Sequence, residues 1–337
     1  MTDVYIHDAV RTPRGKARPD GGLAGGADPR ECRGRDHAQL WRDGQGEGRY
    51  AASEAVSGDA VDHRADAGGD WLAREHRGGG GDPGDDPAHP HARFVPPVLG
   101  ADRLAHAEGI ARSDLDAVAL LSQQRAVAAE DRPALQRSRI DTAALSREEC
   151  LRPQTSAETL ADTPPAFGDL QDQYAAALGG VRFAPLHSIA HAPPVCDGAG
   201  LALLGTDGLG DAPRARVVAF AECGGDPAAS LTAGFAAMDK VLARAGLTID
   251  AMDRIEFMEA FAVTIAKFLR DYDVDPMRVN VGGGHLAKGH PMGASGAILT
   301  SALLDALDAC DGRLGLVVVT GAMGVGAALI VERIDRS

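Results

Sequence analysis

Residues 280–297 read N-V-G-G-G-H-L-A-K-G-H-P-M-G-A-S-G-A, and this stretch determines how the rest of the chain is interpreted. Its glycine run permits positive φ angles and lets another segment approach closely. His290 then stands between Gly289 and Pro291, shortly before residues 298–307, whose apolar spacing predicts a buried helix. The unpaired amides at such a helix start favour negative charge, so a titratable ring there suits chemistry on a carbonyl or a phosphate. The alternative is a tight turn that carries a solvated histidine.

Residues 283–296 also fit the pattern G-G-x-x-A-x-G-H-P-x-G-A-S-G, which resembles the C-terminal signature of the thiolases, enzymes that exchange acyl groups with coenzyme A. A phosphate-binding loop is excluded, because Lys288 precedes Gly289 and His290 stands where a serine or threonine would follow. Two further segments resemble thiolases: D-A-V-R-T-P-R-G-K at residues 8–16 and G-I-A-R-S-D-L-D-A-V-A-L-L-S-Q-Q-R-A at residues 109–126.

The composition bounds the kind of protein. With 337 residues, 45% of them hydrophobic, the chain can bury a large core in one or two α/β units. The net charge of -14 argues against nucleic acid as a partner. No run approaches the ~18 apolar residues of a membrane span and the N-terminus has no signal-peptide pattern, so we expect a cytoplasmic protein outside the membrane. The cysteines lack CxxC spacing and indicate neither zinc nor a disulfide framework: Cys32, Cys150, Cys196, Cys223 and Cys310.

Residues 25–93 differ in composition from the rest of the chain. They lack Ile, Phe, Met, Lys, Asn and Thr and are rich in Gly, Asp, Arg, Ala and His. Such a segment buries too little apolar surface to offset its ordering entropy, so we expect disorder or a poorly packed loop. The same mix arises when a GC-rich gene is read out of frame. We hypothesise that a deletion with a frame change altered a thiolase N-terminal half here, which peptide mass mapping of the natural protein would test.

The apolar patterns outside this segment alternate between strands and helices. Strands are predicted at residues 4–10, 216–223, 255–258, 314–320 and 327–332, and helices at residues 115–130, 233–245 and 262–269. This alternation predicts a layered α/β fold with helices on both faces of a sheet. Residues 321–326 are glycine-rich but open onto a strand, so they do not predict a dinucleotide loop. Residues 186–200 resemble the thiolase loop that ends in D-G-A before a buried helix.

The resemblance implies a thiolase-like layered fold with an intact C-terminal half and a shortened N-terminal half. On this basis we divide the chain into four parts. They are an N-terminal thiolase strand (1–24), a low-order segment (25–93), the remainder of the N-terminal half with a loop domain (94–208) and the C-terminal domain (209–337).

A thiolase requires a cysteine nucleophile, a base that generates its thiolate, a second acid/base cysteine and donors for the thioester oxyanion. The resemblance assigns the base to His290, since an unperturbed imidazole titrates near pH ~6.5. The nucleophile is not identifiable. Thiolases carry it in a Cys-x-Ser-Gly context, whereas Cys32 lies in E-C-R-G and Cys223 in A-E-C-G-G-D.

Two more positions of the thiolase machinery carry other residues. Thr320, at the acid/base cysteine position, can donate a hydrogen bond but does not ionise near neutral pH. Met258 takes the place of the asparagine in N-E-A-F, which holds a water on the second thioester oxygen. Loss of one such donor costs about 10²–10³ in rate in a known hydrolase. Glu259 keeps its place in this motif, either in the catalytic machinery or as packing support.

The resemblance also implies substrate contacts, which fall on His187, Ser295, Ala322 and Gly324. Ala322 replaces a glycine whose amide helps line an oxyanion hole, and the alanine amide serves equally if its φ allows. His187 and His191 are four residues apart, as in metal-binding helices. No glutamate lies between them and two prolines follow, so we expect turn histidines and no metal site.

Together these motifs favour a thiolase-type acyltransferase by descent, which interconverts acyl-CoA plus acetyl-CoA and 3-ketoacyl-CoA plus CoA in lipid metabolism. Groups that act as a unit lose most of their effect with the first member, so we expect weak or no activity, and whether the chain is an enzyme stays open. The alternatives are a non-catalytic acyl-CoA-binding or partner protein and an unfolded pseudogene product. We expect coenzyme A thioesters as substrates, no bound cofactor, and a homo-oligomer if the altered N-terminal half permits one.

Overall fold

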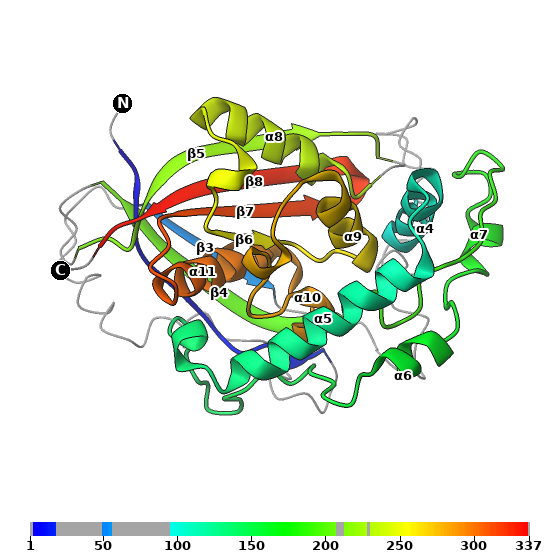
Figure 1. Ribbon diagram of the computed structural model, residues 1–337, viewed down its shortest axis with the longest axis horizontal. Helices are drawn as coiled ribbons and strands as arrows, with labels where there is room; N and C mark the ends of the chain where they lie inside the picture. Colours follow the sequence, from blue (N-terminus) through cyan, green and yellow to red (C-terminus); the bar gives the residue numbers. More distant parts are fainter. Residues whose placement is uncertain (1–2, 18–48, 56–94, 207–211, 228–229, 336–337) are drawn as a thin grey trace.

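The computed structural model describes residues 3–17, 49–55, 95–206, 212–227 and 230–335, with the backbone alone for residues 49–55. At its centre lies a sheet in the order β2-β4-β1-β5-β8-β7-β6, with β3 paired to β4 (Figure 1). Strands β6 and β7 run parallel, and the other ladders of the described sheet are antiparallel. The strands are β1 (Tyr5–Arg11), β2 (Gly15–Lys16), β3 (Arg49–Ala55), β4 (Cys196–Gly205), β5 (Ala215–Gly224), β6 (Arg254–Phe257), β7 (Leu314–Gly321) and β8 (Val325–Arg333).

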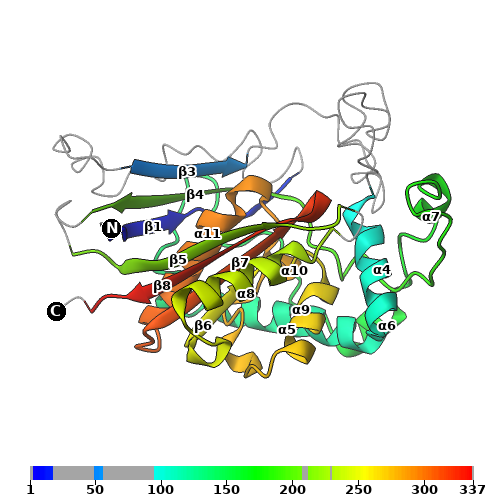
Figure 2. The same cartoon turned by 90° about the horizontal axis from the view of Figure 1, so that it is seen from above.

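Helices cover both faces of this sheet. Two leucines of α11 (Ser295–Asp308) pack over Gly315 of β7, whereas Thr320 of the same strand lies against α8 (Ala233–Ala245). Successive side chains of a strand point to alternate faces, and these two positions differ by an odd number, so α8 and α11 lie on opposite faces (Figure 2). The predicted layered α/β fold is confirmed.

The 19-residue helix α5 (Arg112–Glu130) packs across α9 (Ala262–Asp271) and α10 (His285–Lys288) (Figure 1). The other helices are α4 (Pro97–Glu108), α6 (Ala157–Asp162) and α7 (Leu170–Gln173). Short 3-10 turns are η2 (Pro133–Gln136), η3 (Ile249–Ala251), η4 (Pro276–Arg278), η5 (Met292–Ala294) and η6 (Ala322–Gly324).

Helix α5 is fixed to the glycine-rich stretch by two close contacts. Arg125 donates a 2.6 Å hydrogen bond to the carbonyl oxygen of Val279. Gly283 has a φ of 76°, and a Cβ atom there would lie 2.5 Å from the backbone nitrogen of Ala126. Only glycine meets both conditions without strain. The S-Q-Q-R-A segment of α5 therefore packs directly against the glycine run.

Most predicted elements occur within two or three residues of their expected ends. Helix α8 matches the prediction to the residue, and Gly246 ends it in the left-handed conformation at φ 65°. The strands predicted at residues 4–10 and 314–320 correspond to β1 and β7. Glycine at a helix C-terminus explains the first agreement, because it adopts positive φ without steric cost.

Two local predictions were wrong. The D-G-A segment does not precede a helix, because it lies inside β4, where Asp197 is paired with β2 and the next two residues are paired with β3. Helix α5 begins at Arg112 and not at Leu115, because Asp114 accepts a 2.9 Å hydrogen bond from the Ala111 amide and so fixes an earlier first turn.

Of the low-order segment predicted at residues 25–93, only the β3 backbone belongs to the described residues, and the rest lies outside them. In the described ranges, no helix has the length and apolar character needed to cross a membrane.

Candidate active site

His290 lies on the loop between α10 and α11 and is held by its backbone and by its ring. Its amide donates a 2.7 Å hydrogen bond to the Pro194 carbonyl, and its own carbonyl accepts one from the amide of Cys196 at 3.4 Å. Its Nδ1 lies 3.0 Å from Ser295 Oγ, at the start of α11. Gly289, with φ 98°, packs so tightly on Cys196 that a Cβ atom would come within 2.7 Å of the cysteine Cβ. The turn before the histidine therefore requires glycine.

Arg14 reaches this loop from the turn after β1. Its buried guanidinium donates a 3.0 Å hydrogen bond to the carbonyl oxygen of Gly289. Burial, and then the positive charge of Arg14, lower the pKa of His290 to about 4. The imidazole is therefore neutral at neutral pH, so one ring nitrogen can accept a proton and the other can donate a hydrogen bond.

His285, which we did not single out from the sequence, is the second ring at this site. It is fully buried, its Nε2 lies 3.2 Å from Ser295 Oγ, and its ring centroid lies 5.2 Å from that of His290. Burial lowers the pKa of His285 well below the usual value. The thiolase signature allows any residue at this position. The only indication in the sequence that His285 belongs to the site was its spacing of ten residues before Ser295.

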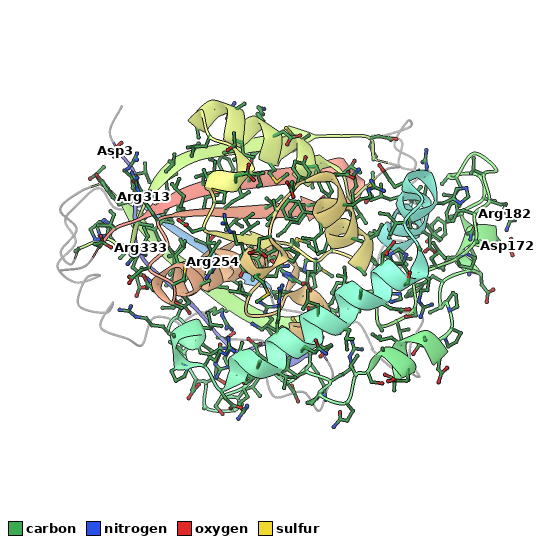
Figure 3. All side chains as sticks on the ribbon, viewed as in Figure 1. Asp3, Asp172, Arg182, Arg254, Arg313 and Arg333 are labelled. Atoms are coloured by element: carbon green, nitrogen blue, oxygen red, sulfur yellow. The ribbon has the colours of Figure 1, made fainter. Side chains whose placement is uncertain are left out.

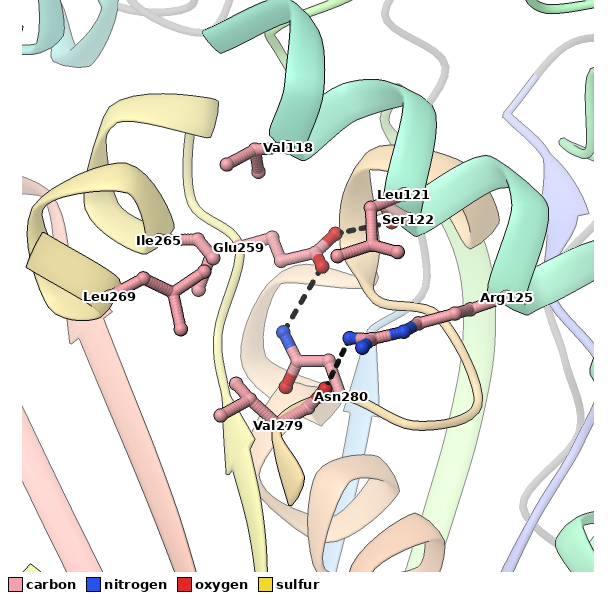
Figure 4. A pocket seen from close by; sticks show the side chains of 9 residues that line it. All are labelled: Val118, Leu121, Ser122, Arg125, Glu259, Ile265, Leu269, Val279 and Asn280. Atoms are coloured by element: carbon pink, nitrogen blue, oxygen red, sulfur yellow. Dashed lines mark hydrogen bonds between the residues drawn. The ribbon is translucent and has the colours of Figure 1, made fainter. Parts of the chain in front are cut away.

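Glu259 joins three segments in the interior beside this site. It accepts hydrogen bonds from Ser122 Oγ at 2.7 Å and from Asn280 Nδ2 at 3.1 Å (Figure 4). It also accepts one from the Leu286 amide at 3.0 Å. Burial raises the pKa of Glu259. Through these hydrogen bonds, Glu259 connects α5 and α10 to the end of β6. This arrangement fits a role in packing better than a role in proton transfer.

Asn280 completes this connection by acting as an additional strand residue. Its side chain donates to the Phe257 carbonyl at 2.9 Å and accepts from the Phe257 amide at 2.8 Å. It thereby pairs the backbone N–H and C=O groups of Phe257 on the edge of β6 that faces away from β7. Glu259 and Asn280 also line a small pocket between α5 and α9, whose nine lining residues include neither His290 nor Thr320 (Figure 4).

Met258 and Thr320 lie at the ends of adjacent strands. Met258 is buried and its amide donates a 2.9 Å hydrogen bond to the Val318 carbonyl of β7. Thr320 is also buried, and its Oγ1 has no hydrogen-bond partner within the described part of the chain. No hydrogen bond between described residues joins either side chain to His290, so the structure does not gather the four residues of the predicted machinery into one hydrogen-bonded set.

The predicted substrate contacts fall in three places. Ser295 contacts both imidazoles. Ala322 is exposed, whereas Gly324 is buried, and its carbonyl accepts a 2.7 Å hydrogen bond from Gly225. His187 is fully buried, with its Nδ1 2.6 Å from Asp102 Oδ1 and its ring edge-on to Phe261 at 5.9 Å.

The two histidines with helical spacing have separate partners. His187 pairs with Asp102 of α4, while His191 Nε2 lies 2.8 Å from Asp116 Oδ1 of α5. Burial, and then the nearby His187, lower the pKa of His191 to about 4. Among the described residues there is no cluster of three or more potential metal ligands.

The cysteines of the described ranges do not provide an evident nucleophile. Burial raises the pKa of Cys150 to about 11 and that of Cys196 well above the usual value. A thiol in such surroundings stays protonated and unreactive. Neither thiol is hydrogen-bonded to the His290 ring, although Cys196 packs on Gly289 and exchanges a backbone contact with the histidine. Cys223 is half-buried at the end of β5, and Cys32 lies outside the described residues.

A cluster of buried charges, which we did not predict from the sequence, adjoins the His290 loop through Arg14. Arg11 donates to Glu148 at 2.7 Å, and the Arg14 amide donates to the same carboxylate at 2.8 Å. Burial raises the pKa of Glu148, but the two arginines outweigh this effect and bring it to about 2. Burial, together with these arginines, lowers the pKa of Lys288 to about 8, and burial raises that of Glu256 to about 7. The cluster attaches the N-terminal strand to the site.

Comparisons with known proteins show to which family the chain is similar. The thiolase N-terminal domain model matches residues 97–180, and the thiolase C-terminal domain model matches residues 211–333. The beta-ketoadipyl-CoA thiolase of Pseudomonas aeruginosa is 35% identical over 248 residues, which are 69% of this chain and 58% of that protein. The 3-ketoacyl-CoA thiolase of Shewanella oneidensis is 33% identical over 252 residues, 70% of this chain and 62% of that protein. The chain thus spans about three-fifths of the length of these relatives.

The fold is also similar to solved structures. Human mitochondrial 3-ketoacyl-CoA thiolase superimposes with a TM-score of 0.74 over 99% of both chains, at 22% identity. The same enzyme in complex with CoA gives 0.74 over 99% of this chain and 98% of that one. Two thiolase domain models match separate parts that together exceed half of the chain, and the fold agrees: this chain belongs to the thiolase family.

Proposed function

We propose that the chain binds acyl-CoA thioesters at the His290 loop and is a thiolase-type acyltransferase whose turnover is slow or absent. The observation that carries this proposal is the neutral imidazole of His290, whose ring contacts Ser295 Oγ and whose preceding carbonyl, that of Gly289, accepts a hydrogen bond from Arg14. A neutral imidazole can accept a thiol proton or donate to a thioester oxygen. The overall reaction is acyl-CoA plus acetyl-CoA to 3-ketoacyl-CoA plus CoA, in either direction.

The other predicted residues are given supporting roles in this proposal. Thr320 and Met258 occupy the positions of an acid/base cysteine and a water-holding asparagine, and neither side chain supplies the missing chemistry. Glu259 stabilises the M-E-A-F motif at residues 258–261 through its hydrogen bonds to neighbouring segments. Ser295 orients His290, and Ala322, Gly324 and His187 belong to the surroundings of the thioester.

A non-catalytic acyl-CoA-binding protein is the second candidate. It is favoured by the absence, in the described part of the chain, of a thiol hydrogen-bonded to His290. In both candidates the ligand is a coenzyme A thioester with no further bound cofactor, in lipid metabolism. The same proposal includes a cytoplasmic location and assembly into homo-oligomers. It also includes the division of the chain into four parts after residues 24, 93 and 208.

Thermal unfolding with CoA and acetyl-CoA tests the binding. A ligand at 100 times its dissociation constant stabilises the folded state by about 2.7 kcal/mol, which raises the melting temperature measurably. The His290→Asn variant is the matched control, because it keeps a polar side chain of similar reach but cannot act as an imidazole. Absence of any shift with CoA and acetyl-CoA would contradict the proposal.

Thiolysis of acetoacetyl-CoA separates the two candidates. We expect little or no CoA-dependent cleavage by the natural chain and a measurable gain in the double variant Thr320→Cys, Met258→Asn if a nucleophile is still present. Binding without any turnover in either protein identifies a non-catalytic acyl-CoA-binding protein. Rapid turnover by the natural chain would contradict the expectation of slow chemistry.

A further inference from the structure

Two imidazoles share one hydroxyl group at this site. Ser295 Oγ lies 3.2 Å from Nε2 of His285 and 3.0 Å from Nδ1 of His290. The rings are 5.2 Å apart and nearly perpendicular, at 78°. His285 occupies a position that the thiolase signature leaves open, so the signature itself does not require this contact.

The number of protons in this group is limited. Burial lowers the pKa of both histidines, that of His290 to about 4, so both rings are neutral at neutral pH. A neutral imidazole has one N–H donor and one acceptor nitrogen, and a serine hydroxyl has one hydrogen. Ser295 can therefore donate to only one of the two rings, and the proton positions on His285 and His290 depend on each other.

The surroundings of His285 decide between the arrangements. Its Nδ1 is buried and has no hydrogen-bond partner among the described residues. A proton on Nδ1 would leave a buried N–H unpaired, which is rarer in proteins than an unpaired acceptor. The proton of His285 therefore belongs on Nε2, from which it is donated to Ser295 Oγ. The hydroxyl hydrogen is then available for Nδ1 of His290.

We propose that His285 is a positioning residue that acts through the Ser295 hydroxyl and keeps the proton of His290 on Nε2. This inference rests on the proposed function, in which His290 is the group that meets the thioester. An Nε2–H donates a hydrogen bond to a thioester oxygen, but it cannot accept a thiol proton until the whole chain of hydrogen bonds reverses. His290 is thus held as a donor, which suits a chain whose described thiols are not hydrogen-bonded to the ring.

Nitrogen-15 NMR of histidine-labelled protein at pH 7 measures the proton positions directly, because the two tautomers have well-separated shifts. We expect the Nε2–H form at both His285 and His290 in the natural chain. The His285→Leu variant removes the donor, so the Ser295 hydroxyl can turn to a carbonyl of the preceding turn, and His290 should then populate both tautomers. The His285→Gln variant keeps an N–H donor and should retain the Nε2–H form.

Two further variants make the result independent of folding defects at position 285. Ser295→Ala breaks the bridge and should give mixed tautomers at His290. Ser301→Ala is its matched control, since this serine lies in the same helix, is equally buried and donates only to the Ile298 carbonyl, so His290 should not change. An Nδ1–H form of His290 in the natural chain, or an unchanged tautomer in both His285→Leu and Ser295→Ala, overturns the inference.

The outcome is separable from that of the proposed function. If the tautomer responds to these variants but CoA and acetyl-CoA do not stabilise the protein, the relay stands and the proposed function fails. If thioesters bind and the tautomer does not respond, the proposed function stands and His285 has no positioning role.

Discussion

At the scale of single residues, His290 is fixed by contacts from separate parts of the sequence. The Pro194 carbonyl accepts its amide proton, Ser295 contacts its ring, and Arg14 holds the carbonyl of the preceding Gly289. Each contact restricts a different part of the residue, and the Arg14 contact also affects the electrostatics of the ring, because Arg14 is charged. This distinction determines which measurements are informative.

Replacement of Arg14 by methionine should raise the pKa of His290. The positive charge of Arg14 is the second cause of the lowered pKa, after burial, so the value should rise above about 4 and stay below the unperturbed ~6.5. An NMR titration of the His290 ring measures it. The control is Lys16→Met, an exposed cation in the next strand that should leave the pKa unchanged. An unaltered pKa in Arg14→Met would show that burial alone is responsible.

The low pKa of His290 also predicts a dependence of stability on pH. Between pH 6.5 and about 4 the unfolded ring is protonated while the folded ring is not, so the unfolded state binds more protons and stability falls as the pH is lowered. The loss is up to about 3 kcal/mol, at about 1.36 kcal/mol per unit of pKa. It is present in full at pH 4 and absent above pH 6.5.

Glu256 has the opposite sign in this window, because its pKa is raised to about 7. The informative quantity is therefore the unfolding free energy of the natural chain minus that of His290→Asn, obtained from urea titrations between pH 7 and pH 4. This difference should decrease toward acid. A difference independent of pH would contradict the depressed pKa.

At the scale of elements, the sequence predicted those whose ends depend on local chemistry. Helix α8 was predicted to the residue because Gly246 ends it, and β7 was predicted to within one residue because its apolar run is continuous. Strand β4 was missed because its D-G-A segment owes its extended form to pairing with β2 and β3, which are distant in sequence. Tertiary pairing of this kind leaves no local periodicity to detect.

The docking of α5 on the glycine run is testable with a pair of glycines. Gly283→Ala places a Cβ within 2.5 Å of the Ala126 backbone at a φ of 76°, whereas Gly109→Ala meets nothing within 4 Å at a φ of 64°. The Gly109 change costs only the left-handed strain, about 1–2 kcal/mol. The Gly283 change should cost about 1–3 kcal/mol more through overpacking. Urea denaturation of both variants measures the difference, and equal losses would mean that α5 shifts freely.

The same reasoning explains how much of the site could be predicted. His290 was identified because it lies in a continuous motif whose spacing is visible in the sequence. Arg14 and His285 were not, because their approach to the histidine depends on a strand turn some 270 residues away and on the rotation of a four-residue helix. Thr320 was assigned by motif position, but its orientation toward α8 follows from strand parity in the finished sheet.

At the scale of the whole molecule, one sheet unites distant parts of the chain. Strand β1, from the first residues, pairs with β4 and with β5, which lie on either side of residue 208, where we divided the chain. The buried carboxylate of Asp305 in α11 connects the same parts. It accepts a hydrogen bond from the Ser138 amide at 2.8 Å and one from Arg214 at 3.0 Å. These connections favour cooperative unfolding of the described parts as one unit.

Asp305→Asn tests this cooperativity. The change weakens charge-assisted hydrogen bonds to Ser138 and Arg214 and should cost about 1.5–3 kcal/mol, because it removes a buried anion from its donors. Native-state hydrogen exchange of amides in β4 and β7 should report the same loss for both strands, since their exchange then requires global unfolding. Asp311→Asn, at an exposed position just beyond the same helix, should change both by less than about 0.5 kcal/mol. If only one of the two strands lost protection, the parts before and after residue 208 would unfold separately, despite the sheet that they share.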